Sequence, residues 1–149
     1  MSSNVLIAID ASSTCTALLD LARRYCRPEH HRLHVLLAID STFAVHDRLA
    51  PIRQDEQEEY PAACDEQRQG DTAVLAAVQA LRDSGFECEG KLVAAEPVDA
   101  IVGQARALEC ELIIMGHRHL SRFGRLLDPS ISAKVIDKVE CAVLVGAAG

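Results

Sequence analysis

The sequence contains few aromatic residues and no tryptophan, and it has neither a surplus of positive charge nor a long hydrophobic run. Aromatic residues make up 3% of the 149 residues, so Leu, Ile, Val and Ala must supply the core volume. This composition favours strands buried on both faces, as in parallel sheets covered by helices. The formal net charge of -7 argues against a nucleic-acid partner, because phosphate backbones are bound by basic surfaces.

Segments that would direct the chain to a membrane or out of the cell are also missing from the sequence. No apolar stretch approaches the ~18 residues that span a bilayer, and the start MSSNVLIAID has no basic region of a signal peptide. We therefore expect a cytoplasmic protein without a membrane partner.

The common signatures of catalysis and metal binding are absent as well. There is no C-x-x-C pair, no Cys/His spacing suited to zinc, no G-x-S-x-G elbow, no Walker loop and no G-x-G-x-x-G. The six cysteines are scattered, so we expect reduced thiols that pack as small apolar side chains. The sequence predicts no catalytic residue, no metal site and no enzyme.

Short apolar runs alternate with segments of helical periodicity along the chain. The runs rich in Val, Ile and Leu predict strands, and the segments between them carry apolar residues at helical spacing. The order β-α-β-α-β-α-β-α-β predicts a single α/β domain over 1–149, with an open, mainly parallel, Rossmann-like five-stranded sheet and helices on both faces. The predicted strands are 5–9, 33–39, 88–95, 111–115 and 141–145.

Local signals predict how the connections run. The segment 41–70 is polar and acidic and contains two prolines, so it is interpreted as a surface connection that runs into the next helix. The next helix is expected to stop near Gly85, and Pro97 is expected at the first position of the helix that follows.

The apolar faces of the helices are predicted from their spacing. They are expected to include Tyr25 in the first helix, Leu75 in the second and Ile136 in the last. The histidines around the start of the second strand are interpreted as surface residues: His30, His31 and His34.

The alternating pattern also predicts where a ligand would lie. In open parallel sheets, ligands bind beyond the carboxyl ends of the strands, at the point where the strand order reverses. We expect the first and fourth strands to be neighbours and to bring Asp10 and Gly116 to one crevice. Taken alone, Asp10 is better explained as a cap of the first helix or as the end of the strand, and Gly116 can be only a tight turn.

The strand endings VLIAIDAS, LHVLLAID and ELIIMG are followed by a basic loop and a closing CAVLV strand. In this order and spacing, over nearly the whole chain except 41–70, the sequence resembles the universal stress protein family. The resemblance implies the fold predicted above and, in nucleotide-binding members, a loop of the form G-x2-G-x9-G-[ST]. Glycines in such a loop let the backbone approach phosphates, and its final hydroxyl residue opens a helix whose N-terminus favours anions.

This loop is degenerate in the present chain. Counted from Gly116, the spacing is kept, but His119 and Pro129 stand at the second and third glycine positions, followed by the expected hydroxyl residue, Ser130. His119 adds a side chain where backbone should approach phosphate, and Pro129 has no N–H to donate. Asp128 can cap the helix with its own carboxylate and repel phosphate.

Other residues favour nucleotide binding. The resemblance implies that Asp10 lies near the adenine and ribose, and arginines of the basic loop can replace lost backbone contacts with charge. The cofactor therefore stays open between none and ATP or AMP. The candidate nucleotide-binding residues are Ala8, Asp10, Ile39, Met115, Gly116, Arg118, His119, Ser130, Ile131 and Ser132.

The final strand is short and wholly apolar and is predicted at a sheet edge, where unpaired backbone groups invite pairing with a second chain. The family resemblance implies the same homodimer. Its predicted interface is Cys141, Ala142, Val143, Leu144 and Val145. The predicted function is a dimeric stress-response module that binds adenine nucleotides weakly or not at all. The alternative is an ATP- or AMP-binding stress protein that uses the basic 116–125 loop in place of the missing glycines.

Overall fold

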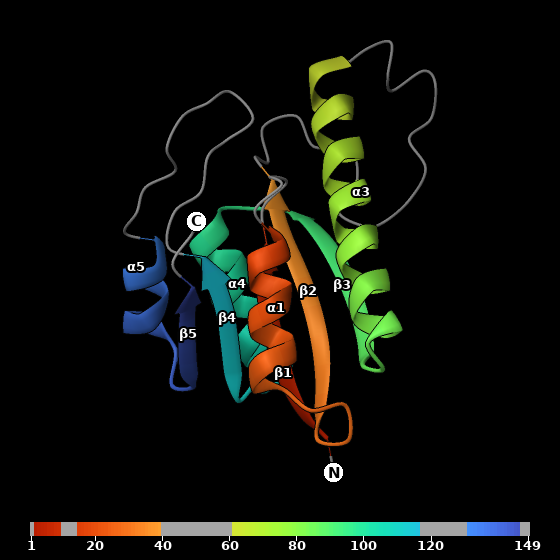
Figure 1. The fold of residues 1–149 in the computed structure, drawn as a ribbon. Helices are drawn as coiled ribbons and strands as arrows, with labels where there is room; N and C mark the ends of the chain where they lie inside the picture. Colours follow the sequence, from red (N-terminus) through yellow and green to blue (C-terminus); the bar gives the residue numbers. More distant parts are fainter. Residues whose placement is uncertain (1, 10–14, 40–60, 117–130, 147–149) are drawn as a thin grey trace.

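A central parallel sheet of five strands runs through the molecule, in the order β3-β2-β1-β4-β5 (Figure 1). The computed structural model describes residues 2–9, 15–39, 61–116 and 131–146. Every neighbouring pair of strands is parallel, which confirms the predicted fold class. The strands are β1 (Ser3–Ile9), β2 (His31–Ile39), β3 (Glu87–Ala94), β4 (Leu112–Gly116) and β5 (Ala142–Gly146).

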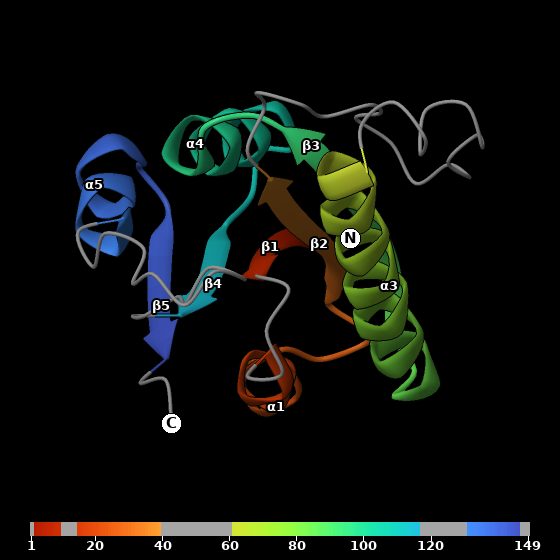
Figure 2. The same ribbon diagram turned by 90° about the horizontal axis from the view of Figure 1, so that it is seen from above.

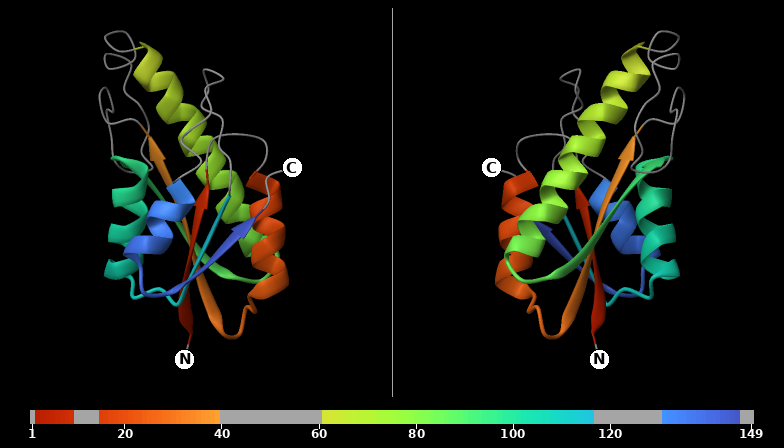
Figure 3. Two further views of the ribbon diagram at one scale, coloured as in Figure 1. Left: turned by 90° about the vertical axis from the view of Figure 1, so that its left-hand side faces the viewer. Right: turned by 90° about the vertical axis from the view of Figure 1, so that its right-hand side faces the viewer.

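Helices cover both faces of this sheet, giving three layers when the molecule is seen from above (Figure 2). On one face lie α1 (Cys15–Tyr25) and α3 (Pro61–Asp83), and on the other lie α4 (Pro97–Ala107) and α5 (Ile131–Lys138). The sheet twists strongly between the layers (Figure 3), as the chirality of L-residues requires. None of the described helices is long and apolar enough to cross a membrane.

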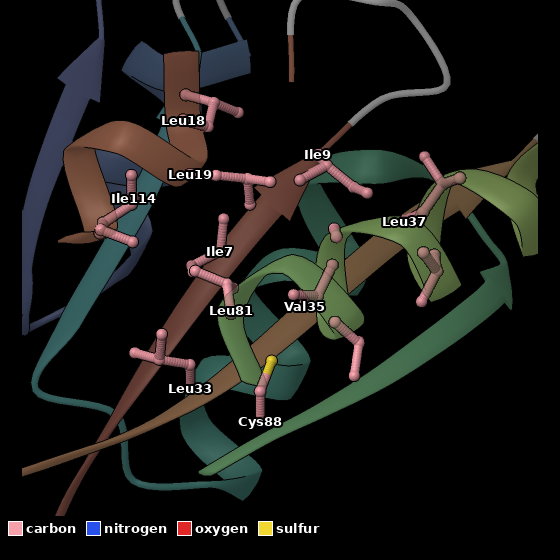
Figure 4. Packing of buried hydrophobic residues seen from close by; sticks show 14 of the residues in the cluster. Ile7, Ile9, Leu18, Leu19, Leu33, Val35, Leu37, Leu81, Cys88 and Ile114 are labelled. Atoms are coloured by element: carbon pink, nitrogen blue, oxygen red, sulfur yellow. The ribbon is translucent and has the colours of Figure 1, made fainter. Parts of the chain in front are cut away.

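Two hydrophobic clusters follow from the alternation of side chains along the strands. In β1, Val5, Ile7 and Ile9 belong to the cluster under α1 and α3, whereas Leu6 and Ala8 belong to the cluster under α4 and α5. Figure 4 shows the first cluster packed between β1, β2 and the helices above them. Because helices cover both faces of the sheet, the sequence of β1 is a continuous apolar run and does not alternate between apolar and polar residues.

Local capping signals are confirmed at two helix ends. Pro97 is the first residue of α4, and the carboxylate of Glu96 before it accepts hydrogen bonds from the N–H groups of Val98 (3.2 Å) and Asp99 (2.9 Å). After α3 ends at Asp83, Gly85 adopts φ 95°, a conformation that glycine enters without steric cost.

The predicted connection 41–70 does run into the next helix, but that helix, α3, begins earlier than its hydrophobic spacing indicated, at Pro61. Proline is well suited to the first position of a helix. Gly70 lies within this helix where it crosses the sheet, and a Cβ there would lie 3.0 Å from Leu92 Cδ1 and 3.1 Å from Leu37 Cδ2. The glycine that looked like a loop residue therefore allows close packing of helix on sheet.

Three side chains predicted to face inward are exposed instead: Tyr25 (54%), Leu75 (55%) and Ile136 (49%). In α3 the buried residues are Val74, Ala77, Val78 and Leu81, which follow the 3.6-residue period. A residue directly after a buried one is turned by about 100° around the helix, and this places Leu75 and Ile136 beside, rather than on, the apolar face.

Two of the histidines interpreted as surface residues are partly buried and fixed by hydrogen bonds. His34 Nε2 lies 3.0 Å from Asn4 Oδ1, and Asn4 Nδ2 donates to the carbonyl of Leu108 at 2.7 Å. His31 Nε2 lies 3.0 Å from the Glu111 carboxylate, while its Nδ1 accepts the Arg27 N–H at 2.8 Å. Only His30 is exposed as expected. The histidines of β2 thus join neighbouring elements of the fold.

We expect His34 to make stability depend on pH. Its pKa is lowered from 6.5, mainly because burial disfavours the charged imidazolium. The neutral form is favoured by folding, so this stabilisation is fully present above pH ~6.5 and is lost as pH falls through the lower folded-state pKa. Urea unfolding between pH 7.5 and pH 5 should show a decline that is reduced in His34→Gln. An identical decline in that variant would contradict the assignment.

Candidate functional site

The strand order reverses between β1 and β4, and the carboxyl ends of these strands meet at one edge of the sheet. Ala8 is paired in register with Met115 across the two strands, which confirms the predicted adjacency. On the far side of β4, Gly116 is paired with Gly146 at the end of β5. This is the place where open parallel sheets bind ligands.

Three of the predicted site residues come together in one cluster beneath this edge. Ala8, Met115 and Ile131 are 5%, 0% and 8% exposed, and all three belong to the cluster under α4 and α5. Ile131 is the first residue of α5, so its side chain anchors the start of that helix to the sheet. Their contribution is therefore a buried apolar wall beneath the carboxyl ends of β1 and β4.

The other described candidates do not belong to that cluster. Ile39 ends β2 and packs in the opposite cluster, while its carbonyl accepts the N–H of Ala95 at 3.2 Å. Ser132 is 6% exposed within the first turn of α5. Gly116 is buried at the end of β4. The remaining candidates lie outside the described residues: Asp10, Arg118, His119 and Ser130.

The described candidates at this edge are apolar residues and glycine, apart from Ser132. No group of three or more His, Cys, Asp or Glu suited to a metal is found among the described residues. Three thiols pack in the clusters as expected, and burial raises the pKa of Cys26, Cys88 and Cys110 to about 11. Thiols with such pKa values are poor nucleophiles at neutral pH.

Gly146 is a residue of this edge that the sequence reasoning missed. A Cβ at this position would lie 2.6 Å from Leu21 Cδ1 and 3.5 Å from Leu18 Cδ2, so any larger residue would require the Leu21 side chain to move. A glycine directly after an apolar strand was the available signal, since such glycines often mark a close approach of another segment.

These features define a class: a doubly wound parallel α/β protein whose strand order reverses between β1 and β4. A model of the universal stress protein family matches residues 1–146. The chain belongs to the universal stress protein family.

Individual relatives agree with this assignment. Universal stress protein Sll1388 of Synechocystis is 31% identical over 68 residues, and the match covers 46% of this chain and 44% of that protein. The structure of the hypothetical protein MJ0577 is similar with a TM-score of 0.75, at 22% identity, over 99% of this chain and 96% of that one. An AMP-bound universal stress protein of Arabidopsis thaliana is similar with a TM-score of 0.68, at 14% identity, over 99% and 92%. Universal stress proteins in complex with dAMP and with cAMP share the fold.

Proposed function

We propose that the protein is a dimeric, non-enzymatic stress-response module of the cytoplasm that binds adenine nucleotides weakly. The observation that carries this proposal is the sequence of the phosphate loop after Gly116, which has His119 and Pro129 where nucleotide-binding members have glycines. The loop keeps the spacing and the hydroxyl residue of the motif, so a nucleotide site can still form there. It would have fewer phosphate donors than a loop with all three glycines.

The geometry of the described residues supports this function. Relatives of the same fold hold AMP, dAMP or cAMP, and the apolar wall of Ala8, Met115 and Ile131 is suited to packing beneath a base. The same wall carries no charge or nucleophile that would act on a phosphate. We therefore assign the crevice a binding role and no hydrolysis of ATP.

Analysis of the protein as purified tests the proposal without added ligand. The protein is denatured, and the released small molecules are separated and compared with nucleotide standards. We expect far less than one adenine nucleotide per chain, since weakly held ligand is lost during purification. Stoichiometric ATP or AMP in the supernatant would instead favour the alternative in which the basic 116–125 loop replaces the lost glycine contacts.

We further propose that two copies associate through β5, which lies at one edge of the sheet. Its residues are all apolar or glycine, and Val143, Leu144 and Val145 are only half-buried within one chain. The opposite edge strand, β3, carries Glu87, Glu89 and Lys91 instead, and charged residues of this kind protect an edge from pairing. The difference between the two edges favours β5 as the interface.

A charge within β5 should therefore separate the two copies. We expect Val143→Asp to shift the native chain from dimer to monomer in light scattering, because the carboxylate would be buried without a partner. The matched control is Val93→Asp, which places the same charge at a half-buried valine of the other edge strand and should leave the dimer intact. A native chain that is already monomeric at tens of micromolar would refute the proposed interface.

A further inference from the structure

A cavity lies on the face of the sheet covered by α4, beside that helix and over β2 and β3. Its volume is about 330 Å3, at the lower end of the range of small-molecule sites. Leu6 on β1 and Leu36 on β2, which are 1% and 2% exposed, form its apolar floor, and Leu108 at the C-terminal end of α4 forms an apolar side. Figure 2 shows α4 on this face next to the strands. The cavity is built from the middle of the strands, away from the crevice at their carboxyl ends.

Polar groups are placed around this apolar lining by strand register. His34 is paired with Glu89, and Leu36 with Lys91, across the parallel strands β2 and β3. Cys88 and Leu92 pack in the cluster under α3, so alternation turns Glu89 and Lys91 to the opposite face. Gln104 completes the polar part of the lining from α4.

Hydrogen bonding fixes which nitrogen of His34 carries the proton. Asn4 Nδ2 donates to the Leu108 carbonyl, so Asn4 Oδ1 is the atom that faces His34 Nε2 and can only accept. Nε2 therefore holds the hydrogen, and in the neutral ring Nδ1 is an acceptor. Burial lowers the pKa of His34 and favours this neutral form.

Two hydrogen-bond acceptors on neighbouring strands therefore have no donor among the described residues. His34 Nδ1 and the carboxylate of Glu89 stand at paired positions, and no described residue donates a hydrogen bond to either. Lys91, two residues along the same strand face, forms no ion pair with a described residue. Glu89 and Lys91 are both exposed, so an anion and a cation lie two residues apart on one strand face at the rim of the cavity.

We propose that this cavity binds a free α-amino acid with an apolar side chain. The ammonium group of the ligand donates to Glu89 and to Nδ1 of His34, and its carboxylate accepts from Lys91 and the amide of Gln104. The apolar side chain packs on Leu6, Leu36 and Leu108. A zwitterion matches the pair of opposite charges, whereas an amine or a carboxylic acid alone would satisfy only one of them.

Three probes of similar shape separate these contributions in a heteronuclear NMR titration of the full chain. They are L-leucine, 3-methylbutylamine without the carboxylate, and 4-methylpentanoate without the ammonium group. We expect leucine to shift the resonances of His34, Glu89 and Lys91, and the two truncated probes to bind at least roughly tenfold more weakly. Absence of saturable shifts with leucine, or equal binding of a truncated probe, would overturn the proposal.

Two variants with one control locate the binding in the cavity. Glu89→Gln and Lys91→Met should each weaken leucine binding by roughly tenfold or more, since each removes a charge-assisted hydrogen bond. The control is Glu87→Gln on the same strand face, where the carboxylate is already held by Arg32 at 3.0 Å; it should leave leucine affinity unchanged. Equal losses in all three variants would show a general charge effect and contradict the site.

The dependence on pH gives an independent readout. The charged groups that act on the pKa of His34 are Glu89 on β3 and Arg32 on β2. Lys91 lines the same cavity, whereas Asn4, Gln104 and Leu108 contribute no charge. Protonation of Nδ1 removes the acceptor and adds a positive charge next to the ligand's ammonium group. Leucine affinity should therefore fall as the pH is lowered through the pKa of His34, and affinity that is independent of pH would contradict the assigned contact.

Discussion

ATP should bind the native chain with a dissociation constant above ~10 μM. Relative to a loop with all three glycines, Pro129 removes a backbone donor, and the loss of a hydrogen bond to a charged group costs about 1.5–3 kcal/mol. The carboxylate of Asp128 adds repulsion at a helix N-terminus of about 0.3–1 kcal/mol. Because about 1.4 kcal/mol corresponds to a factor of ten, these two changes alone weaken binding by at least one decade.

The arginines of the basic loop offset only part of this loss. Arg118, Arg122 and Arg125 supply positive charge after β4, but exposed charge pairs contribute less than about 1 kcal/mol each. A neutral N–H held by the backbone does not have to be ordered on binding, whereas a long side chain does. The balance therefore favours weak binding.

Restoring the loop should restore affinity. We expect the combined variant His119→Gly, Asp128→Leu and Pro129→Gly to bind ATP at least roughly tenfold more tightly than the native chain in calorimetry. His30→Gly, at an exposed position of the turn before β2, is the matched control for adding a glycine to a loop. Submicromolar binding of ATP by the native chain would show that the basic loop compensates and would contradict the proposed weak site.

The fold was predictable from the sequence because its signals are local and agree with one another. The apolar run of β1, the helix start at Pro97 and the turn at Gly85 each depend on a few neighbouring residues. The adjacency of β1 and β4 followed from the general rule for alternating strands and helices. These signals do not depend on the details of packing.

The features that were missed depend on contacts between distant residues. Gly70 marks the place where α3 approaches Leu37 and Leu92, and Gly146 the place where β5 passes α1; in the sequence both are only glycines. His34 is partly buried because it shares a face of the sheet with α4, which no local pattern shows. The same applies to the site, where the register of Ala8 with Met115 is a property of the assembled sheet.

Replacing Leu81 of α3 should lower the free energy of unfolding far more than replacing Leu75 in the same helix. Leu81 is 0% exposed within the cluster under α1 and α3 (Figure 4), whereas Leu75 is 55% exposed. Leucine and alanine have similar helix propensities, so both substitutions to alanine leave the helix itself nearly unchanged. Any difference between the two variants therefore measures packing against the sheet.

We expect Leu81→Ala to lower the free energy of unfolding by about 2–5 kcal/mol, since it removes buried methyl groups and leaves a cavity. Leu75→Ala should change it by less than about 0.5 kcal/mol. Urea unfolding at one fixed protein concentration measures both, because an associating chain gains stability with concentration. Leu81→Met, with an expected cost below about 1.5 kcal/mol, keeps the comparison possible if the alanine variant does not fold. Equal losses at positions 75 and 81 would mean that Leu75 faces the sheet after all, and that the apolar face of α3 is turned as the spacing of its hydrophobic residues first indicated.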